Sequence, residues 1–156
     1  MAATRGTQFL VKAGVAFSLH PYDYDPNADR VGVQAAQALG LDPGLTLKTL
    51  MVEVDRRPAC CVIPADHSLS MKKVAAAFGG KHAEMMPPDK AERLTGYHVG
   101  GISPFGQKRA VPVAIEVTVA GAERVWINAG QRGLLLGIAP GEALRATGGK
   151  AAALLA

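Results

Sequence analysis

The 156-residue sequence predicts an α+β fold, with a single domain over residues 1–156 built on a mixed, largely antiparallel sheet with surrounding helices. Three observations lead to this fold class. Strand patterns come in pairs that suit hairpins, helical patterns are interspersed at irregular intervals, and the regular strand–helix alternation of a doubly wound nucleotide fold is missing. With 49% hydrophobic and 19% charged residues, the chain has the composition of a folded domain.

The first half of the chain combines helical and extended patterns. Val31, Ala35 and Ala38 recur at helical spacing, and Gly40 follows as a helix stop. Further on, the RRP segment at 56–58 is expected to separate two strands of a hairpin. The predicted elements of this half are a helix over 5–13 closed by Gly14, a strand over 15–22, a helix over 31–39, and strands over 47–54 and 59–65.

The second half begins with the clearest helix signal. Ser70 can cap a helix that Gly79 can end, and Leu69 and Val74 have the spacing of a hydrophobic staple. A short segment, HAEMM, then precedes a helix that starts at a proline. The predicted elements of this half are the helix between Ser70 and Gly79, a helix over 88–96, strands over 111–119, 123–129 and 134–138, and a closing helix over 141–147.

Charge and composition limit the classes of function. The 17 Lys and Arg residues outnumber the 13 Asp and Glu residues, so a net charge of +4 would help to attract a polyanion. The cations occur in scattered pairs, which favours a basic region on a folded surface over a disordered nucleic-acid-binding arm. No apolar run is long enough to cross a membrane, and the N-terminus lacks a signal-peptide core, so a cytoplasmic protein is expected.

The two cysteines, Cys60 and Cys61, are adjacent in a predicted strand. Their side chains should point to opposite faces of the sheet, and a disulfide between neighbours would be strained. We expect two reduced, structural thiols.

The candidate catalytic side chains form no known motif. The four histidines have no metal-ligand spacing, so we expect no metal. Ser103 is followed by proline and has no linked base, which favours a turn serine. Asp23, Asp25 and Asp29 lie in a polar segment where Asx turns are common. Trp126 and Phe105 are too few for a stacking platform on single-stranded nucleic acid.

The glycine loop at 100–109, GGISPFGQKR, departs from two phosphate- or acyl-handling motifs. Its lysine comes one residue too late for a P-loop, and Phe105 replaces the second glycine of a nucleophile elbow. Without Cβ atoms, Gly100 and Gly101 allow a ligand close to their amides, which could orient a carbonyl or stabilise an oxyanion. A purely structural turn is the alternative. Phe105 is expected to pack over or cover the site and to tolerate substitution better than Gly101.

Lys48 is the other candidate, because it lies within an otherwise apolar strand beside Thr49. A lysine on a solvated strand face is the ordinary explanation. The alternative is a cation held on a rigid strand and facing a cleft.

Along nearly its whole length the sequence resembles the YbaK/EbsC family of aminoacyl-tRNA deacylases, relatives of the editing domain in bacterial prolyl-tRNA synthetases. Several segments carry this resemblance in the expected order: HPYDYDP, LGLDP, LKTLMV, SMKKVAAAFGGKHAEM, TGYHVGGISPFGQKR and NAGQRGL. The most specific combination is the Gly-x-x-x-Pro element, Gly100–Pro104, together with the strand lysine Lys48.

The resemblance implies hydrolysis of the ester between a wrong amino acid and the tRNA 3′ end. The expected substrate is cysteinyl-tRNA(Pro), with aminoacyl-tRNA and a prolyl-tRNA synthetase as partners and with no cofactor. In the cysteine branch the substrate's own thiol attacks its carbonyl, which needs no protein nucleophile. The implied catalytic residues are Lys48, Gly100 and Gly101, and the implied substrate-binding residues are Tyr22, Thr49, Ile102, Ser103, Pro104, Asn128 and Leu135.

Two positions depart from the cysteine-specific branch. Asn128 stands where that branch has a serine before its glycines, and Leu135 stands where it has an aspartate after Arg-Gly-Leu. Two alternatives therefore stay open. One is a deacylase for another small amino acid, alanine or serine, and the other is a non-catalytic tRNA- or synthetase-binding module.

Overall fold

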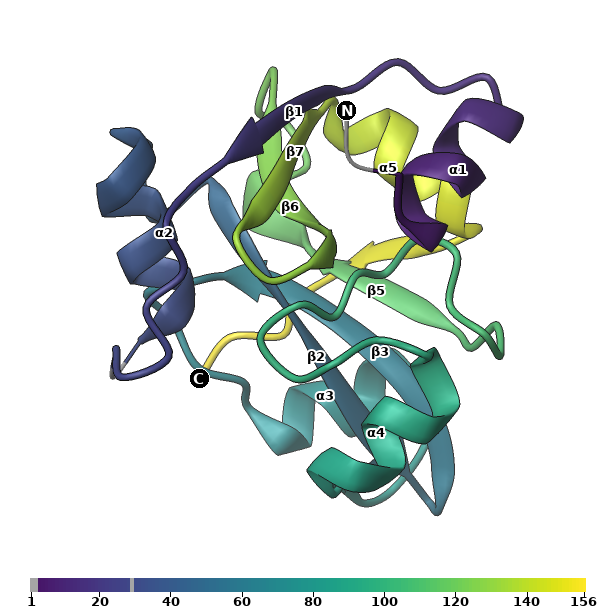
Figure 1. Ribbon diagram of the computed structural model, residues 1–156. Helices are drawn as coiled ribbons and strands as arrows, with labels where there is room; N and C mark the ends of the chain where they lie inside the picture. The colour runs from purple at the N-terminus through teal and green to yellow at the C-terminus, as the bar shows by residue number, and fades with distance from the viewer. Residues whose placement is uncertain (1–2, 29) are drawn as a thin grey trace.

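The computed structural model describes residues 3–28 and 30–156 and has the predicted α+β architecture (Figure 1). Asp29, one of the three predicted turn aspartates, lies outside the described residues. The helices are α1 (Arg5–Lys12), α2 (Val31–Leu39), α3 (Met71–Ala77), α4 (Pro88–Thr95) and α5 (Pro140–Thr147). The strands are β1 (Ser18–Pro21), β2 (Thr46–Val54), β3 (Arg57–Pro64), β4 (Ala83–Met85), β5 (Val113–Glu116), β6 (Val125–Gln131), β7 (Leu134–Ile138) and β8 (Lys150–Ala152).

The strands form one mixed sheet in the order β1-β7-β6-β2-β3-β5-β8, with β4 paired to the far end of β2. The β1–β7, β6–β7, β2–β3 and β2–β4 pairings are antiparallel, and the β2–β6, β3–β5 and β5–β8 pairings are parallel. The long β2–β3 hairpin joins the two halves of the sheet. β2 therefore lies in the middle, where its neighbours hold it in place.

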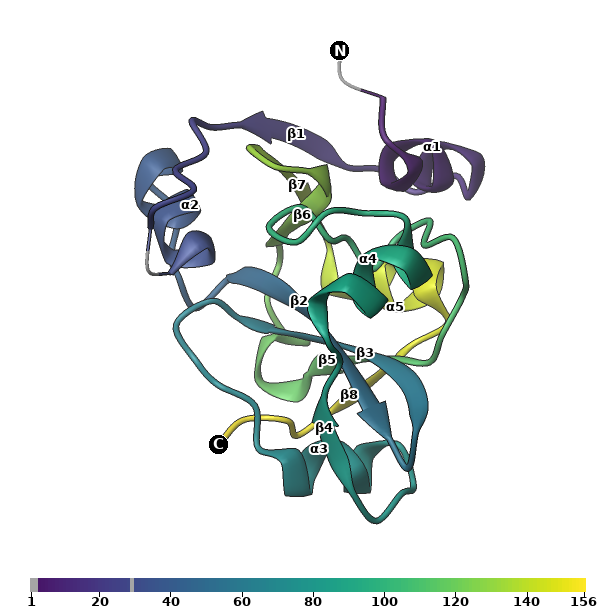
Figure 2. The same cartoon turned by 60° about the horizontal axis from the view of Figure 1, so that its bottom comes forward.

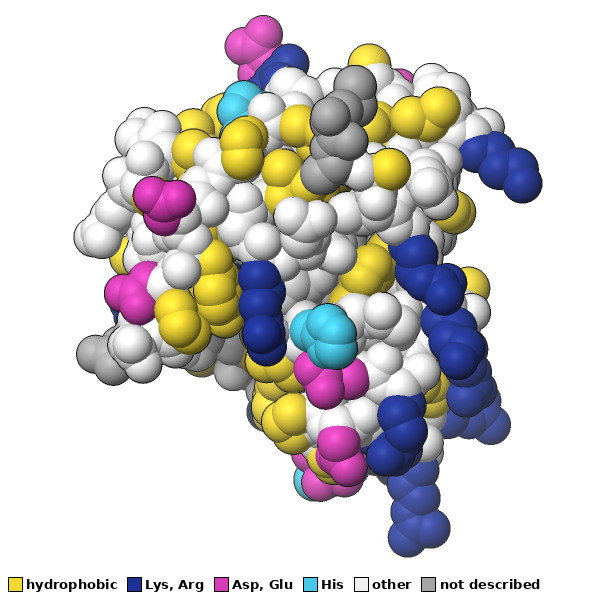
Figure 3. All heavy atoms as spheres, in the orientation of Figure 1, with side chains coloured by type: hydrophobic (Ala, Val, Ile, Leu, Met, Phe, Trp, Pro, Cys, Tyr) yellow, Lys and Arg dark blue, Asp and Glu magenta, His cyan; other side chains and the backbone are white. Residues whose placement is uncertain are grey.

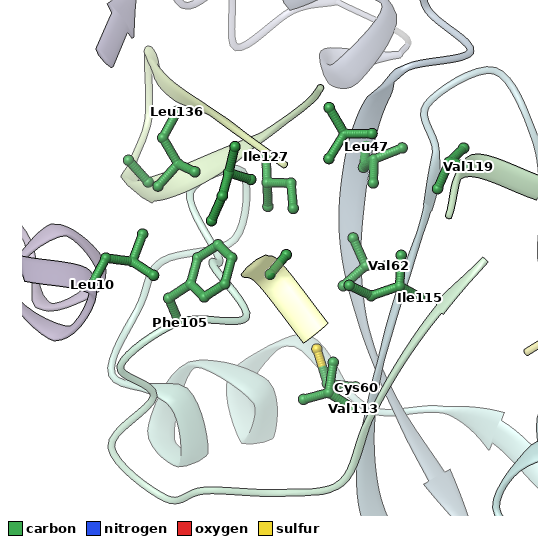
Figure 4. Packing of buried hydrophobic residues seen from close by; sticks show 14 of the residues in the cluster. Leu10, Leu47, Cys60, Val62, Phe105, Val113, Ile115, Val119, Ile127 and Leu136 are labelled. Atoms are coloured by element: carbon green, nitrogen blue, oxygen red, sulfur yellow. The ribbon is translucent and has the colours of Figure 1, made fainter. Parts of the chain in front are cut away.

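Helices cover both faces of the sheet, and the adjacent cysteines mark the two sides. Cys60 belongs to the larger apolar cluster, which includes residues of α1, α4 and α5, and Cys61 belongs to the smaller cluster with α3 (Figure 4). Figure 2 shows α4 and α3 on opposite sides of β2 and β3. Both thiols are free and buried, as predicted, and burial raises the pKa of Cys61 to about 12.

Local sequence explains how several elements begin and end. Ser70 Oγ accepts the Lys73 amide at 3.2 Å and caps α3, as predicted. Pro88 begins α4, where its missing N–H costs nothing, and Gly40 ends α2 in the left-handed region at φ +66°. No helix among the described residues is long and apolar enough to cross a membrane.

The hairpin turn differs from its prediction. Asp55 and Arg56 form the turn at φ +49° and +69°, a pair of left-handed residues that suits the twist of a two-residue hairpin. Pro58 was expected to lie between the two strands, but it lies inside β3, opposite Glu53.

Several further strands differ from the sequence predictions. β1 covers only residues 18–21 of the predicted strand over 15–22. The strand predicted over 111–119 ends at Glu116, because the Glu116 carboxylate accepts the amides of Thr118 and Leu154 and the chain turns into a 3₁₀ helix. β4 and β8 were not predicted as strands, and each has only three residues.

Phe105 was expected to pack or to cover the site, and the structure supports packing only. Its side chain is fully buried in the larger apolar cluster and is among the largest side chains buried there (Figure 4). It is therefore part of the core rather than a cover for the site, and it cannot stack on a base.

We expect Phe105→Ala to lower the free energy of unfolding by about 3–5 kcal/mol, because it leaves a cavity in a core that cannot fully collapse. Urea denaturation followed by circular dichroism measures this loss. Val11→Ala is the control, since Val11 is 69% exposed and its truncation should change the unfolding midpoint little. Equal midpoints for the two variants would contradict the burial of Phe105.

Candidate functional site

A cavity of about 430 Å³ opens between the middle of β2, the first turns of α2 and the glycine loop. Its wall is mainly apolar. The lining residues that carry charge or a side-chain polar group are Tyr22, Tyr24, Arg30, Thr46, Lys48, Thr49 and Asn128. The cavity therefore combines an apolar floor with a few fixed polar groups, as small-molecule sites do.

The structure brings most of the residues implied by the resemblance to this cavity. Seven of them line it: Tyr22, Lys48, Thr49, Gly100, Ile102, Asn128 and Leu135. Gly101, Ser103 and Pro104 do not line it. They belong to the glycine loop but are buried within it, outside the wall of the cavity.

Lys48 projects from the central strand into the cavity region together with Arg30, the residue before α2. Burial is the main cause that lowers the pKa of Lys48, the positive charge of Arg30 lowers it further, and Asp66 opposes the shift. Within residues 3–28 and 30–156, Lys48 has no ion-pair partner within 4 Å. An anion in the cavity would relieve the repulsion between these two cations.

Gly32 lets the first turn of α2 lie close to Ala65, the residue that follows β3. A Cβ on Gly32 would lie 2.8 Å from Ala65 Cβ, a distance at which one of the two elements must move. The small residue therefore sets the distance between the helix that follows Arg30 and the sheet.

Two hydroxyl-bearing residues beside these cations are partly buried. Thr49 Oγ1 is buried and has no hydrogen-bond partner among the described residues. Tyr22 donates its amide to the Gly133 carbonyl at 2.9 Å, and burial is the main cause that raises the pKa of its phenol. Tyr22 therefore stays a neutral donor at neutral pH, and the Thr49 hydroxyl is an unsatisfied buried polar group next to the cavity.

Asn128 ties the glycine loop to the sheet. Its Nδ2 donates to the Gly100 carbonyl at 3.3 Å, and its Oδ1 accepts the amides of Gly130 and Gln131 at 2.7 and 3.1 Å. The β6–β7 register shifts between Asn128 and Gln131, so the side chain also satisfies amides that the irregular ladder leaves free. One side chain thus joins the end of β6 to the backbone of Gly100, a residue that lines the cavity.

The neighbouring peptide of Val99 is held by two charged side chains. The Glu92 carboxylate accepts the Val99 N–H at 2.8 Å, and Arg132 Nε donates to the Val99 carbonyl at 2.8 Å. The Arg132 guanidinium also lies 5.5 Å from the centre of the Tyr24 ring, a cation–π distance. Hydrogen bonds to charged groups are stronger than neutral ones, so this clamp fixes the start of the glycine loop.

Sequence reasoning missed Tyr24, Glu92 and Arg132. Arg132 and Tyr24 each sit within a quoted family segment, but their partners come from distant parts of the chain. No local spacing in the sequence indicates these contacts.

Gly100 needs to be glycine for two reasons. Its φ is +91°, which L side chains rarely adopt, and a Cβ would lie 2.6 Å from the Tyr24 hydroxyl. Gly101 has a different constraint, because its Cβ would lie 2.7 Å from the Arg132 backbone nitrogen. Both glycines therefore permit close packing of the loop.

Some amides of the loop form hydrogen bonds within the protein, and others have no partner among the described residues. Gly101 donates its N–H to the His98 carbonyl at 2.8 Å, and Phe105 donates to Ser103 Oγ at 3.2 Å. Ser103 is fully buried in this role, so the prediction of a turn serine is confirmed. The amides of Gly100 and Ile102 donate to no described residue, and both residues line the cavity.

Carboxylate, thiol, serine and imidazole side chains lie outside the described cavity wall. Among the described residues, no Ser, Cys, Asp, Glu or His lines the cavity. The same part of the chain contains no group of three or more His, Cys, Asp or Glu placed to hold a metal ion. Asp25 Oδ1 accepts the Asn27 amide at 3.0 Å, which is the Asx turn predicted for this segment.

Comparison with known proteins identifies one family. The sequence profile of the aminoacyl-tRNA editing domain matches residues 25–146. EbsC of Enterococcus faecalis, provisionally named a Cys-tRNA(Pro)/Cys-tRNA(Cys) deacylase, is 32% identical over 131 residues, which cover 83% of this chain and 80% of that protein. A proline–tRNA ligase of Geobacter metallireducens is 28% identical over 96 residues, which are 62% of this chain and 16% of the ligase.

A solved structure has the same fold. A protein described as a candidate trans-editing enzyme for prolyl-tRNA synthetase superposes with a TM-score of 0.85 at 23% identity, covering 100% of this chain and 99% of that chain.

The hydrogen bond between the Val99 N–H and the Glu92 carboxylate should make the conformation of the loop depend on pH. The Val99 N–H is the main cause that lowers the pKa of Glu92, so this contact is intact above the ordinary glutamate pKa of about 4.3 and is lost as pH falls through the lowered value. We expect the Val99 amide resonance to show a transition below pH ~4.3 in a two-dimensional NMR titration. Glu92→Gln should abolish the transition, and Glu142→Gln, a change at an exposed ion pair, should leave it intact. A transition that survives in Glu92→Gln would contradict the clamp.

Proposed function

The chain belongs to the aminoacyl-tRNA editing domain family, and we propose that it acts in trans to remove cysteine from mischarged tRNA(Pro) without a nucleophile from the protein. One observation carries the proposal. Two cations, Arg30 and Lys48, line the cavity. Gly100 and Ile102 also line it, and their amides have no hydrogen-bond partner among the described residues. No described carboxylate, thiol, serine or imidazole lines the same wall.

The positions of the charged residues favour one orientation of the substrate in this cavity. A 3′-terminal aminoacyl-adenosine carries an anionic phosphodiester at one end and an α-ammonium at the other. Lys48 and Arg30 attract the phosphodiester and repel the ammonium. The Gly100 carbonyl, which uses one lone pair for Asn128, can accept a hydrogen bond from the ammonium. This orientation would place the ester between the cations and the loop.

The unpaired amides would then act on the ester carbonyl. In the proposed reaction the cysteine thiol attacks its own carbonyl carbon and a sulfur–carbon bond forms. The ester C–O bond breaks, the ribose oxygen takes up a proton, and water then opens the thiolactone. The amides of Gly100 and Ile102 stabilise the oxyanion that forms in between, and the cavity holds thiol and carbonyl in contact.

Three buried residues of the glycine loop would support this reaction without lining the cavity: Gly101, Ser103 and Pro104. Gly101 and Ser103 hold the turn through the bonds described above, and Gln107 Nε2 donates to the Ser103 carbonyl at 3.0 Å. We propose that these residues position the amides of Gly100 and Ile102, which donate hydrogen bonds to the oxyanion, and do not contact the substrate themselves.

We assign specificity for the amino acid to two residues that are paired on neighbouring strands of the sheet. Asn128 on β6 is directly opposite Leu135 on β7, and both line the cavity. The two departures from the cysteine-specific branch are therefore neighbours. Leu135 is only 4% exposed, so this end of the cavity is apolar and discriminates between small side chains weakly. This apolar character favours a second candidate function, a deacylase with measurable activity on alanyl- or seryl-tRNA.

We expect Lys48→Ala to reduce the single-turnover rate of deacylation by roughly 10²-fold, because it removes a cation that holds the substrate phosphodiester. Lys48→Arg should retain part of the rate, since the charge stays but the planar guanidinium has a different shape. Thermal unfolding checks that the variants fold, and Lys72→Ala, which removes an exposed lysine on α3, is the control. Wild-type turnover by folded Lys48→Ala would sink the assignment.

A panel of mischarged tRNAs tests the substrate. We expect the fastest release from cysteinyl-tRNA(Pro), with slower release from alanyl- and seryl-tRNA. Leu135→Asp should narrow this range, because a buried carboxylate would demand a hydrogen-bonding or cationic group in the substrate. The isosteric Leu135→Asn separates the effect of charge from that of shape. Tight tRNA binding with no release from any substrate would favour a non-catalytic module instead.

A further inference from the structure

A second hollow of about 430 Å³ lies behind the glycine loop. Its lining residues come from the start of α1, the segment after α4, and the β6–β7 turn: Ala3, Thr4, Arg5, Gly96, Tyr97, His98, Gly101, Gly130, Gln131 and Arg132. We call it the rear groove. Its described lining has two arginines, an exposed histidine and no carboxylate, and the Glu92 carboxylate lies beside it, 3.5 Å from His98 Nδ1.

One stretch of backbone separates the rear groove from the cavity. Val99 and Gly100 line the cavity, whereas His98 and Gly101 line the rear groove. A polymer whose last unit enters the cavity can therefore continue over the edge of this stretch into the rear groove.

Further cations extend the rear groove. A Cβ on Gly96 would lie 3.4 Å from both Arg5 Nε and Lys108 Cβ, so the Arg5 guanidinium and the Lys108 side chain flank the same glycine. Figure 3 shows Lys and Arg side chains gathered along the side of this face that carries α1 and α4. Within the described residues, neither Arg5 nor Lys108 forms an ion pair.

We propose that the rear groove binds the phosphodiester backbone of the single-stranded 3′ end of tRNA, upstream of the terminal adenosine. This inference rests on the proposed function, because it starts from an aminoacyl-adenosine in the cavity. Guanidinium groups match phosphate oxygens in geometry, and the exposed ring of His98 can stack on a base. RNA is favoured over an acidic protein surface because the rear groove continues a site that takes the end of an RNA chain.

The test measures RNA binding separately from deacylation. The probe is a fluorescent, uncharged RNA hairpin of the acceptor stem with its single-stranded 3′ end, and its affinity is measured by anisotropy between 50 and 300 mM salt. Arg5→Ala with Lys108→Ala should weaken binding about ten-fold and lower the salt slope by about 1.4, about 0.7 for each lost phosphate contact on a single strand. The matched control is Lys72→Ala with Lys81→Ala, which removes two exposed lysines outside the rear groove.

The same hairpin without its single-stranded end locates the contact. Wild type should prefer the RNA that has the 3′ end, and the groove variant should lose that preference. Unchanged affinity and slope in the groove variant, or an equal loss in the control, would overturn the inference. Equally tight binding of polyaspartate would also overturn it, because a general acidic-surface site would then replace an RNA site.

Failure of the proposed function has a different signature. Wild type would then bind the hairpin through the rear groove but release no amino acid from any charged tRNA.

Discussion

The backbone of Val99 holds the start of the glycine loop in place, because charged side chains bind both its N–H and its carbonyl. Glu92 comes from α4 and Arg132 from the β6–β7 turn, so two distant parts of the fold meet at one backbone unit. Asn128 continues the restraint one residue further, at the Gly100 carbonyl. The loop that follows is thereby fixed without the regular hydrogen bonds of a helix or strand, which is the condition for preorganised electrostatic groups.

The same part of the loop requires glycine. Gly100 lies where a side chain would meet the Tyr24 hydroxyl, and its left-handed conformation excludes most other residues. Side-chain charge enters from the other wall, where β2 carries Lys48 in the middle of the sheet. A rigid strand and a clamped loop thus face one another across an apolar cavity. That arrangement suits a reaction in which the protein orients the substrate and the substrate provides the nucleophile.

Much of the fold could be read from local sequence, because the deciding contacts are local. Ser70 and Gly40 act within one helical turn of their helices, and Cys60 and Cys61 face opposite clusters as strand alternation requires. The three-residue strands β4 and β8 escaped prediction because only their partners define them. In the site, the family resemblance pointed to residues that do line the cavity, but the clamp depends on pairs distant in sequence. Phe105 was misjudged for the same reason: its burial depends on packing from α1, β6 and β7.

The central claim is that Asn128 positions the loop for the reaction, and one comparison of rates tests it most directly. Single-turnover deacylation of cysteinyl-tRNA(Pro) is measured for wild type and Asn128→Ala, with thermal unfolding as the check on folding. The account predicts a rate lower by about 10–10²-fold in a folded variant, because a displacement of about 1 Å at the Gly100 carbonyl misaligns the ester. A folded Asn128→Ala protein that deacylates this substrate at the wild-type rate would contradict it.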